Sequence, residues 1–392
     1  MPLFIVYNPV CGDKSATKFF KEHVVPLLDK ADLKPESVQE TQREGHAGEL
    51  ISTTLSTSHE EVTIVLGSGD GTLHEIVNEL YGGGSRPEAK VKIVLVPCGT
   101  ANALYSSLYP PSGPDAIQDV DYRLKALKSF IGGAASYVPL SFAVTTVSAA
   151  GAPNSNKPLV SSVVISTSLH AAILRDSEQL RDEHPGIERF KIAAQQNSDK
   201  WYNARAKLLP LPGGAPQIYD PKDGAFHDFK DTSGDGSAEL EGPFAYFLST
   251  VNVDRLEPAF NITPLSRQIK PPAGSCDVII IRPLRDPSVS ADSPEARQAF
   301  VPKLWAVLGG AYQEGSHVRL RYTKSGDVVT EGDGQLVVEY ARCGGWRWIP
   351  DEADPGAHWL CSDGYVTGIG KGQTAESKIP PATEGNIVVC AS

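Results

Sequence analysis

The segment Gly67-Ser68-Gly69-Asp70-Gly71-Thr72 places one carboxylate among three glycines, between an apolar run (62–66) and a stretch with helical periodicity (73–80). A glycine-rich loop between a strand and a helix exposes backbone N–H groups at the positive end of the helix, and this arrangement favours an anion such as phosphate. A carboxylate beside a phosphate is unfavourable unless it binds a metal ion or accepts a proton from an attacking hydroxyl. We therefore predict a phosphate-binding loop in which Asp70 performs one of these tasks.

The helix that follows the loop is expected to begin at Thr72. Thr72 and Glu75 have the spacing of a capping box, in which each side chain bonds to the other residue's backbone. Apolar residues then recur through 73–80 at the spacing of one helix face. On this interpretation Glu75 could have no role beyond capping its own helix.

Two further strand-and-turn units accompany this loop in the first 130 or so residues. Residues 3–7 form a short apolar run before Asn8-Pro9, and residues 91–96 form another before Pro97-Cys98-Gly99-Thr100-Ala101-Asn102. Repetition of strand, glycine turn and helix predicts a parallel sheet whose ligands bind at the carboxyl ends of the strands.

The pattern changes after about residue 137, where short β-rich runs are separated by turn residues. The expected strands are 159–166, 244–250, 278–281, 317–322, 336–340 and 346–349, and the expected helices are 171–181 and 295–308. Three segments rich in Gly, Pro, Asp and Ser are expected to be mobile loops: 210–241, 285–294 and the tail from Gly370. The sequence thus predicts an α/β protein, with a Rossmann-like parallel-sheet domain over 1–136 and a β-sandwich domain over 137–392.

Composition narrows the class of function. The chain has 392 residues, with 36 Lys and Arg against 47 Asp and Glu and a net charge of −11, which argues against nucleic acid as a partner. The uncharged stretch between Lys128 and Lys157 is long enough to span a bilayer, but its recurrent Gly, Pro, Ser and Thr favour two strands. The six cysteines lack metal-binding spacing and the N-terminus lacks signal-peptide features, so we expect a cytoplasmic protein with reduced thiols.

In this order the motifs resemble those of the diacylglycerol kinase and sphingosine kinase superfamily of lipid kinases. The matching segments are Tyr7-Asn8-Pro9-x-x-Gly12, Thr41-x-x-x-Gly45-His46-Ala47, Gly67 to Thr72 followed by His74, Glu75 and Asn78, and Pro97 to Leu104. Later segments are similar to the family's second-domain and closing motifs: Asp176-Ser177-Glu178-x-x-Arg181, Gly186-x-x-Arg189-Phe190 and Trp359-x-Cys361-Ser362-Asp363-Gly364. The resemblance covers nearly the whole chain and is strongest up to residue 105.

The resemblance implies a nucleotide-binding domain, a lipid-binding β-sandwich, and ATP in the cleft between them. It implies that Asp70 is the general base and that Asp363 helps to organise Mg²⁺. The residues that it places around the nucleotide are Asn8, Pro9, Thr41, Gly69, Gly71, Thr72, Glu75, Gly99, Thr100, Asn102, Arg181, Arg189, Asp363 and Gly364. The two arginines could instead form ordinary salt bridges with nearby acids, and Asp333 is a rival for the closing Asp-Gly motif.

The departures from the family pattern concern the substrate more than the reaction. Where sphingosine kinases carry an acidic residue that recognises the sphingoid head group, this sequence has Leu174, and Asp176 is the nearest replacement. The expected acceptor is therefore the hydroxyl of a sphingoid base, diacylglycerol or ceramide, and contact with the membrane surface is expected to be transient. The apolar side chains of 163–174 and 301–308 are candidate walls for the lipid tail.

Two alternatives stay open at this stage. An NAD-kinase-like enzyme would share the Gly-Asp-Gly loop, but it should carry an Asn-Glu pair in a strand-rich context, and Asn78-Glu79 falls on the expected helix. A catalytically impaired, lipid-binding regulatory homologue is favoured by the altered first motif and by Tyr365, which replaces the last acid of the family's Asp-Gly-Glu. The sequence does not give the oligomeric state.

Overall fold

Strands from both ends of the chain form the first sheet of the computed structural model, which describes residues 2–56, 60–82, 89–149, 157–184, 186–381 and 386–391. The sheet has six strands in the order β2-β1-β3-β4-β22-β5. Their bounds are Leu3–Tyr7 (β1), Ser37–Glu40 (β2), Glu61–Ser68 (β3), Lys90–Pro97 (β4), Ser136–Pro139 (β5) and Ile387–Ala391 (β22). All neighbouring pairs are parallel except β22 with β5.

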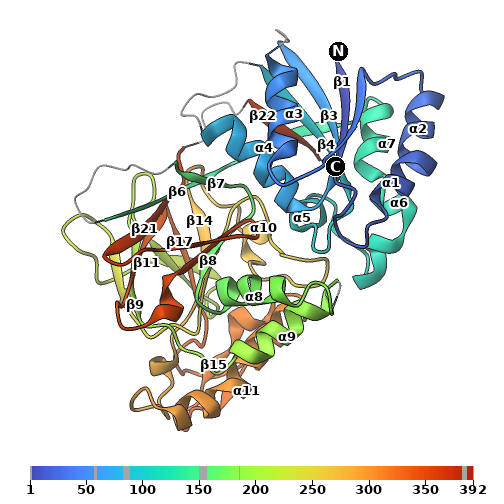
Figure 1. The fold of residues 1–392 in the computed structure, drawn as a ribbon. Helices are drawn as coiled ribbons and strands as arrows, with labels where there is room; N and C mark the ends of the chain where they lie inside the picture. Colours follow the sequence, from blue (N-terminus) through green and yellow to red (C-terminus); the bar gives the residue numbers. More distant parts are fainter. Residues whose placement is uncertain are drawn as a thin grey trace.

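Helices cover both faces of this sheet (Figure 1). One face carries α3 (His46–Leu55) and α4 (Asp70–Gly82), while the other carries α1 (Ala16–Phe19), α2 (Val25–Lys30), α6 (Val120–Arg123) and α7 (Lys125–Ile131). Residues 62–68 of β3 are all buried, as expected of a parallel strand that is covered on both sides. The short helix α5 (Ala103–Leu108) follows β4. The parallel strands therefore direct their carboxyl ends, and the loops after them, to one edge.

The second half of the chain is built from two antiparallel sheets. One has the order β11-β10-β17-β14-β13-β8-β19-β20 and the other has the order β12-β9-β18-β21-β6-β7. The strand bounds are Ala143–Ala149 (β6), Leu159–Ser161 (β7), Val164–Thr167 (β8), Ala204–Leu209 (β9), Gln217–Asp220 (β10), Ala225–Asp228 (β11), Ala238–Glu241 (β12), Tyr246–Thr250 (β13), Cys276–Ile281 (β14), Glu339–Cys343 (β17), Gly345–Pro350 (β18), Trp359–Ser362 (β19), Tyr365–Gly368 (β20) and Gln373–Lys378 (β21). Arg321–Tyr322 (β15) and Val328–Val329 (β16) form a separate pair.

Aromatic side chains fill the space between these two sheets. Phe247 of β13 packs against Trp346 and Trp348 of β18, with ring centroids 5.2 and 5.3 Å apart. The indole N–H of Trp346 donates to the Ser249 hydroxyl at 2.8 Å, so the buried polar atom is satisfied. This packing confirms the predicted α/β class, with a parallel-sheet domain followed by a β-sandwich.

The helices of the second half gather at one end of the sandwich (Figure 1). They are α8 (Ser168–Gln179), α9 (Glu188–Asn197) and α11 (Pro294–Ala311), with the short α10 (Leu265–Gln268) elsewhere. Among the described residues, every helix is too short or too polar to cross a bilayer.

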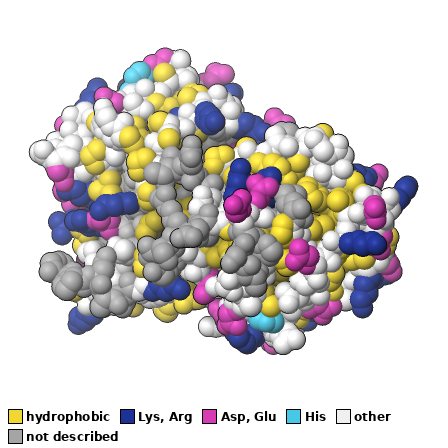
Figure 2. Space-filling model, turned by 90° about the horizontal axis from the view of Figure 1, so that it is seen from above, with side chains coloured by type: hydrophobic (Ala, Val, Ile, Leu, Met, Phe, Trp, Pro, Cys, Tyr) yellow, Lys and Arg dark blue, Asp and Glu magenta, His cyan; other side chains and the backbone are white. Residues whose placement is uncertain are grey.

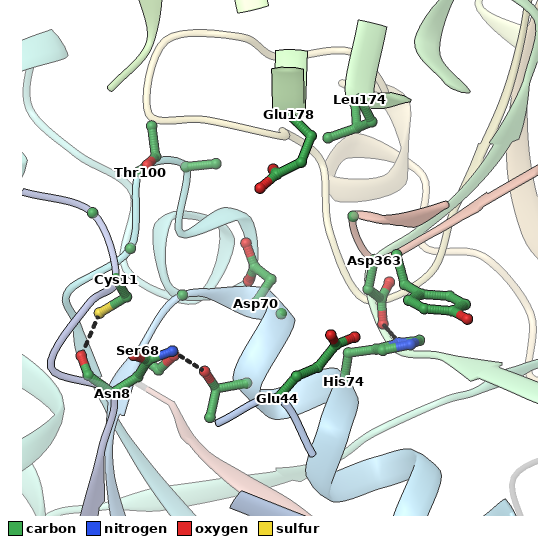
Figure 3. A pocket seen from close by; sticks show the side chains of 18 of the residues that line it. Asn8, Cys11, Glu44, Ser68, Asp70, His74, Thr100, Leu174, Glu178 and Asp363 are labelled. Atoms are coloured by element: carbon green, nitrogen blue, oxygen red, sulfur yellow. Dashed lines mark hydrogen bonds and ion pairs between the residues drawn. The ribbon is translucent and has the colours of Figure 1, made fainter. Parts of the chain in front are cut away.

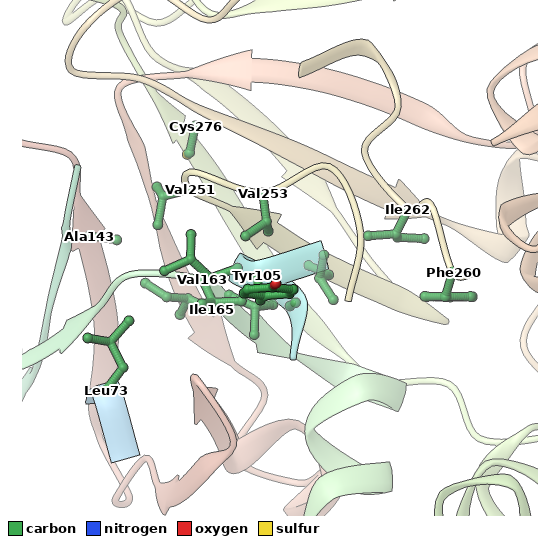
Figure 4. Packing of buried hydrophobic residues seen from close by; sticks show 14 of the residues in the cluster. Leu73, Tyr105, Ala143, Val163, Ile165, Val251, Val253, Phe260, Ile262 and Cys276 are labelled. Atoms are coloured by element: carbon green, nitrogen blue, oxygen red, sulfur yellow. The ribbon is translucent and has the colours of Figure 1, made fainter. Parts of the chain in front are cut away.

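Apolar side chains from both halves of the chain join in one cluster. Figure 4 shows Tyr105 of α5 close to Val163 and Val253 of the second half, and Leu73 of α4 and Val251 belong to the same cluster. All of these side chains are buried. The two halves therefore share a core at their junction.

Several sequence-based expectations were wrong. The segment 210–241 contains β10, β11 and β12, and the tail from Gly370 contains β21 and β22, so neither is simply a loop. Residues 316–319 form a 3₁₀ turn where a strand was expected. The helix after the Gly-rich loop begins at Asp70 rather than Thr72, so Thr72 is not its N-cap. The turn expected over 151–156 lies outside the described residues.

Candidate active site

A cavity of about 800 Å³ lies where the loops at the carboxyl ends of β1, β3 and β4 meet α8 and the β19–β20 turn (Figure 3). The sequence-predicted residues that line it are Asn8, Thr41, Gly69, Asp70, Gly71, Thr72, Glu75, Gly99, Thr100, Asn102, Leu174, Arg181, Arg189, Asp363 and Gly364. Pro9 and Asp176 are not among the lining residues. Motifs as far apart in sequence as Asn8 and Gly364 thus meet around one cavity. Those of the first half meet because parallel strands end at one edge.

Asp70 is the first residue of α4, and it is held by the start of another helix. Its Oδ2 accepts the Ala103 N–H at 2.7 Å and its Oδ1 accepts the Leu104 N–H at 3.1 Å. Burial raises the pKa of the Asp70 carboxyl to about 6, and the charge of Asp363 acts in the same direction against the two amide bonds. Asp70 is therefore ionised at neutral pH and is a stronger base than an ordinary aspartate.

Glycines allow the loops that follow β3 and β4 to touch. A Cβ on Gly99 would lie 2.4 Å from the Gly69 Cα, so only glycine fits there. A Cβ on Gly71 would meet nothing within 4 Å, which shows open space beside the start of α4. Free N–H groups at a helix N-terminus next to open space form an anion-binding site.

Two polar side chains with predicted nucleotide roles hold backbone in place. Asn102 has a left-handed backbone, with φ of 54°, and exchanges hydrogen bonds with the Gly99 N–H at 2.9 Å and the Gly99 carbonyl at 2.7 Å. The Glu75 carboxylate accepts hydrogen bonds from the amides of Gly45 and Ala47 at the start of α3, and burial raises its pKa. Glu75 thus caps the neighbouring helix rather than its own.

The two arginines of the second half differ in their surroundings. Arg181 is exposed and forms a two-pronged ion pair with Glu178, with both N···O distances 2.6 Å. Arg189 is only 6% exposed, and its Nε has no hydrogen-bond partner. Burial, followed by the charge of Arg181, lowers the pKa of Arg189. The guanidinium lies over the Phe190 ring, with 4.7 Å between Cζ and the ring centroid, and no carboxylate of the described residues forms an ion pair with it. A buried guanidinium of this kind at a cavity wall is suited to bind an anionic ligand.

Asp363 connects the two halves of the protein. Its carboxylate accepts the backbone N–H groups of Ser162 at 2.7 Å, Val163 at 2.9 Å and Val164 at 2.8 Å. The ring of His74 on α4 lies 3.4 Å from the same carboxylate (Figure 3). By contrast, the rival Asp333 is exposed and pairs with Lys222. The structure thus places Asp363, and not Asp333, at the cavity.

The carboxylate that was expected to recognise the lipid head group, Asp176, is paired with side chains of the protein. Leu174 lines the cavity, while Asp176 binds Arg175 through two contacts of 2.6 and 3.1 Å and also accepts from Asn197 at 2.9 Å. The interpretation of Asp176 as a counter-charge for an amine therefore has no support from its position.

Some residues that line the cavity were not predicted as site residues from the sequence. They are Glu44, Ser68, His74, Glu178, Trp359 and Tyr365 among others. Each lies within or beside a recognised motif, and this proximity was the feature of the sequence that could have indicated them. His74 also has its ring centroid 6.0 Å from that of Tyr365, so it contacts the β19–β20 turn that it was not expected to reach.

The few carboxylates of the cavity fit a divalent cation whose other ligands are the phosphate oxygens of a nucleotide and water. Among the described residues, no three His, Cys, Asp or Glu side chains form a group that could hold a metal ion. Mg²⁺ usually binds one or two carboxylates together with substrate phosphates and water. Asp70 and Asp363 are the carboxylates of suitable position, although both already accept amide hydrogen bonds.

Comparisons with known proteins agree with this geometry. Residues 2–130 match the diacylglycerol kinase catalytic domain family. The chain is 29% identical over 244 residues to sphingosine kinase 1 of Arabidopsis thaliana, covering 62% of this chain and 46% of that protein. It is 36% identical over 123 residues to human sphingosine kinase 2, covering 31% of this chain and 18% of that protein. The matched segments thus span less than half of either relative.

The fold is also similar to a solved one. The crystal structure of "a putative diacylglycerol kinase from Bacillus anthracis str. Sterne" aligns with a TM-score of 0.54 and 14% identity, covering 100% of this chain and 95% of that one. At that identity the likeness concerns the fold alone. The family match and the sequence relatives lead to one assignment: residues 2–130 belong to the superfamily of diacylglycerol kinases and sphingosine kinases.

Proposed function

We propose that this protein is an ATP-dependent lipid kinase that transfers the γ-phosphoryl group to the hydroxyl of a lipid. The observation that supports the proposal most is that a basic carboxylate and a cationic side chain lie on opposite walls of one cavity. Asp70, with its raised pKa, lies on the wall from the first half, and the Arg189 guanidinium, whose Nε has no hydrogen-bond partner, lies on the wall from the second. Phosphoryl transfer requires a proton acceptor for the hydroxyl and positive charge near the phosphates.

In this proposal the first half, 1–136 with the strands that complete its sheet, binds the nucleotide, and 137–392 binds the lipid. Gly69, Gly71 and Gly99 bring backbone N–H groups and the start of α4 close to the phosphates. Arg189, with Arg181 near it, offsets their charge. Mg²⁺ would be held by the phosphates with Asp70 or Asp363 in reach, where it supplies further charge neutralisation.

The reaction itself needs little from the protein beyond position and one proton acceptor. The lipid oxygen forms a bond to the γ-phosphorus as the bond between that phosphorus and the β–γ bridging oxygen breaks. The hydroxyl proton moves to the Asp70 carboxylate, and ADP leaves. The Ala103 and Leu104 amides each bond to a different Asp70 oxygen, and a carboxylate has about four lone-pair sites, so sites stay available for this proton.

Two observations bear on the acceptor lipid, and they favour different classes. The similarity to proteins named sphingosine kinases favours a sphingoid base. The apolar Leu174 in the cavity and the pairing of Asp176 with Arg175 favour a neutral alcohol such as diacylglycerol or ceramide. A panel of sphingosine, ceramide, diacylglycerol and monoacylglycerol, read by product mass with Mg·ATP, decides between them. NAD in the same panel tests the NAD-kinase-like alternative.

The decisive variant is Asp70→Asn, which keeps the shape of the side chain but removes its basicity. We expect ATP binding close to that of wild type and turnover reduced by roughly 10²–10⁴-fold. Glu44→Gln is the matched control, because Glu44 lines the same cavity and its loss should leave most of the turnover. Near-normal turnover by Asp70→Asn would show that Asp70 is not the base. ATP binding with no product from any lipid would favour the impaired homologue.

The pH dependence gives a second test of the same residue. A general base acts only when ionised, and the pKa of Asp70 is about 6. We therefore expect kcat/KM to fall about tenfold per pH unit below about pH 6 and to be flat just above it. A profile that stays flat down to pH 4 would contradict the assignment.

A further inference from the structure

From Phe300 to its end, helix α11 is apolar on both its buried and its exposed side. From Phe300 to Ala311 its one charged residue is Lys303, which forms an ion pair with Asp286 beside the helix. One side of the helix is buried in the second half of the protein, through Phe300, Leu304, Val307 and Leu308. A helix that is apolar all round is typical of a protein interior or a membrane, yet α11 lies at the surface.

The exposed side forms a continuous line along the helix, which we call the α11 stripe. Its members are Val301, Pro302, Trp305, Ala306, Gly309 and Tyr312, and each has another member three or four positions away. Val301 and Gly309 are half-buried and the other four are exposed. Trp305 is 36% exposed and Tyr312 is 48% exposed. In the face of the molecule shown in Figure 2, charged side chains of both signs lie among the apolar ones. No member of the α11 stripe is charged.

The stripe belongs to the same end of the sandwich as α8 and α9 (Figure 1). The ring of Phe300 packs edge-on against Trp201, just after α9, with centroids 5.9 Å apart. Gln298 donates to Asp199 in the same segment at 2.7 Å. Helix α8, which packs against α9, supplies Leu174, Arg175 and Glu178 to the wall of the cavity. The stripe is thus joined to the active-site wall through one group of packed helices.

We propose that the α11 stripe docks on the interfacial region of a lipid bilayer, where α11 lies in the plane of the membrane without crossing it. Trp and Tyr are enriched at that interface, because their rings are apolar and their N–H or O–H groups reach water or lipid head groups. The Tyr312 hydroxyl already has such a polar partner in Glu257, at 2.6 Å. The choice of a lipid surface rests on the proposed function, since a lipid kinase must take its substrate from a membrane.

The absence of charge on the stripe determines which membrane it fits. Lys303 is neutralised by Asp286, and the chain carries a net charge of −11, so attraction to anionic lipid is not the source of binding. Binding should instead depend on apolar contact, occur on zwitterionic phosphatidylcholine vesicles, and persist at high salt.

Sedimentation of the full chain with phosphatidylcholine vesicles tests the proposal. We expect Trp305→Glu and Ala306→Glu to lower the vesicle partition coefficient at least about tenfold, because each places a charge at the interface. Both positions are exposed, so the fold should be unaffected, which circular dichroism checks. Val38→Glu is the matched control: Val38 is an exposed valine of β2, 48% exposed, and its replacement should leave binding unchanged. Trp305→Phe should retain most of the binding.

Separate measurements distinguish failure of this proposal from failure of the proposed function. If phosphorylation of a short-chain, monomeric lipid is normal in Trp305→Glu while that of vesicle-bound lipid falls, both proposals stand. Vesicle binding that depends on Trp305 in a protein without kinase activity would overturn only the function. Equal vesicle binding by wild type and Trp305→Glu, no binding by either, or a change in oligomeric state in place of vesicle binding would overturn the role of the stripe.

Discussion

Arg189 illustrates how a residue with a ligand-binding role can be recognised from what its surroundings lack. The side chain is buried and its Nε has no partner, whereas the neighbouring Arg181 is exposed and fully paired with Glu178. Burying a charge without a partner is costly, and folding alone gives no reason to keep it. A ligand with negative charge supplies that reason.

We predict that Arg189→Met stabilises the free protein, by about 1 kcal/mol or more, because it removes a buried charge that forms no ion pair with a carboxylate of the described residues. In the same variant the apparent Kd for Mg·ATP should rise by roughly ten- to a hundredfold, since a charge-assisted hydrogen bond contributes about 1.5–3 kcal/mol. Urea unfolding and calorimetric titration measure the two effects. Arg181→Met is the control and should weaken ATP less. A destabilised Arg189→Met that binds ATP normally would assign Arg189 a purely structural role.

For other site residues, the position at the cavity was predicted from the sequence but the hydrogen-bond partners were not. Asp70, Gly99 and Arg189 all line one cavity, as predicted. Their positions could be predicted because the motifs that contain them can be recognised in the sequence. The hydrogen-bond partners of Glu75 and Asp363 could not be predicted, because each carboxylate binds backbone amides of a segment that is distant in sequence. A local pattern such as a capping box describes only neighbours along the chain.

At the scale of elements, the position of β22 is the least predictable feature. Its residues follow a segment that is rich in polar and glycine residues, and the tail was expected to be a loop. In the structure β22 occupies an inner position of the first sheet, where Val389 pairs with Ile93 of β4 on one side and Val138 of β5 on the other. The strands β1, β3 and β4 could be recognised in the sequence because they are apolar and precede glycine turns. Pairing between the first and last thirds of a chain leaves no such local signal.

The position of β22 leads to a prediction about stability. Val389→Asp should lower the free energy of unfolding by more than about 4 kcal/mol, since it buries an unpaired carboxylate between two strands. Val38→Asp, on the exposed edge strand β2, should cost less than about 1 kcal/mol. Urea unfolding followed by far-UV circular dichroism compares the two. Similar effects of both substitutions would mean that β22 is not an inner strand.

For the whole molecule, the important question is how firmly the nucleotide half and the lipid half are connected. The Asn78 side chain on α4 pairs with Val160 of β7 like a neighbouring strand, donating to its carbonyl at 2.8 Å and accepting its N–H at 2.9 Å. Val160 is buried, so the two backbone groups have no access to water if this pair is lost. The junction also includes the shared apolar cluster of Figure 4 and the contact between His74 and Asp363.

The distribution of tryptophan makes this connection measurable. All five tryptophans lie in the second half, at 201, 305, 346, 348 and 359, so their fluorescence reports the unfolding of that half. In the proposed function ATP is bound mainly by the first half. If the two halves unfold together, Mg·ATP should raise the midpoint seen by tryptophan, because a ligand stabilises every part of a cooperative unit.

We predict that Asn78→Ala reduces this ATP-induced shift of the tryptophan midpoint by more than half while the first half still binds ATP. The variant leaves the Val160 amide and carbonyl unpaired, which weakens the junction by about 2–4 kcal/mol. Asn197→Ala is the control, because Asn197 is a buried asparagine whose partners Asp176, Ala193 and Lys200 all belong to the second half. That variant should lower the midpoint and keep the full ATP-induced shift. An unchanged shift in Asn78→Ala would show that the apolar cluster alone couples the two halves, and that the Asn78 pair only aligns α4 with β7.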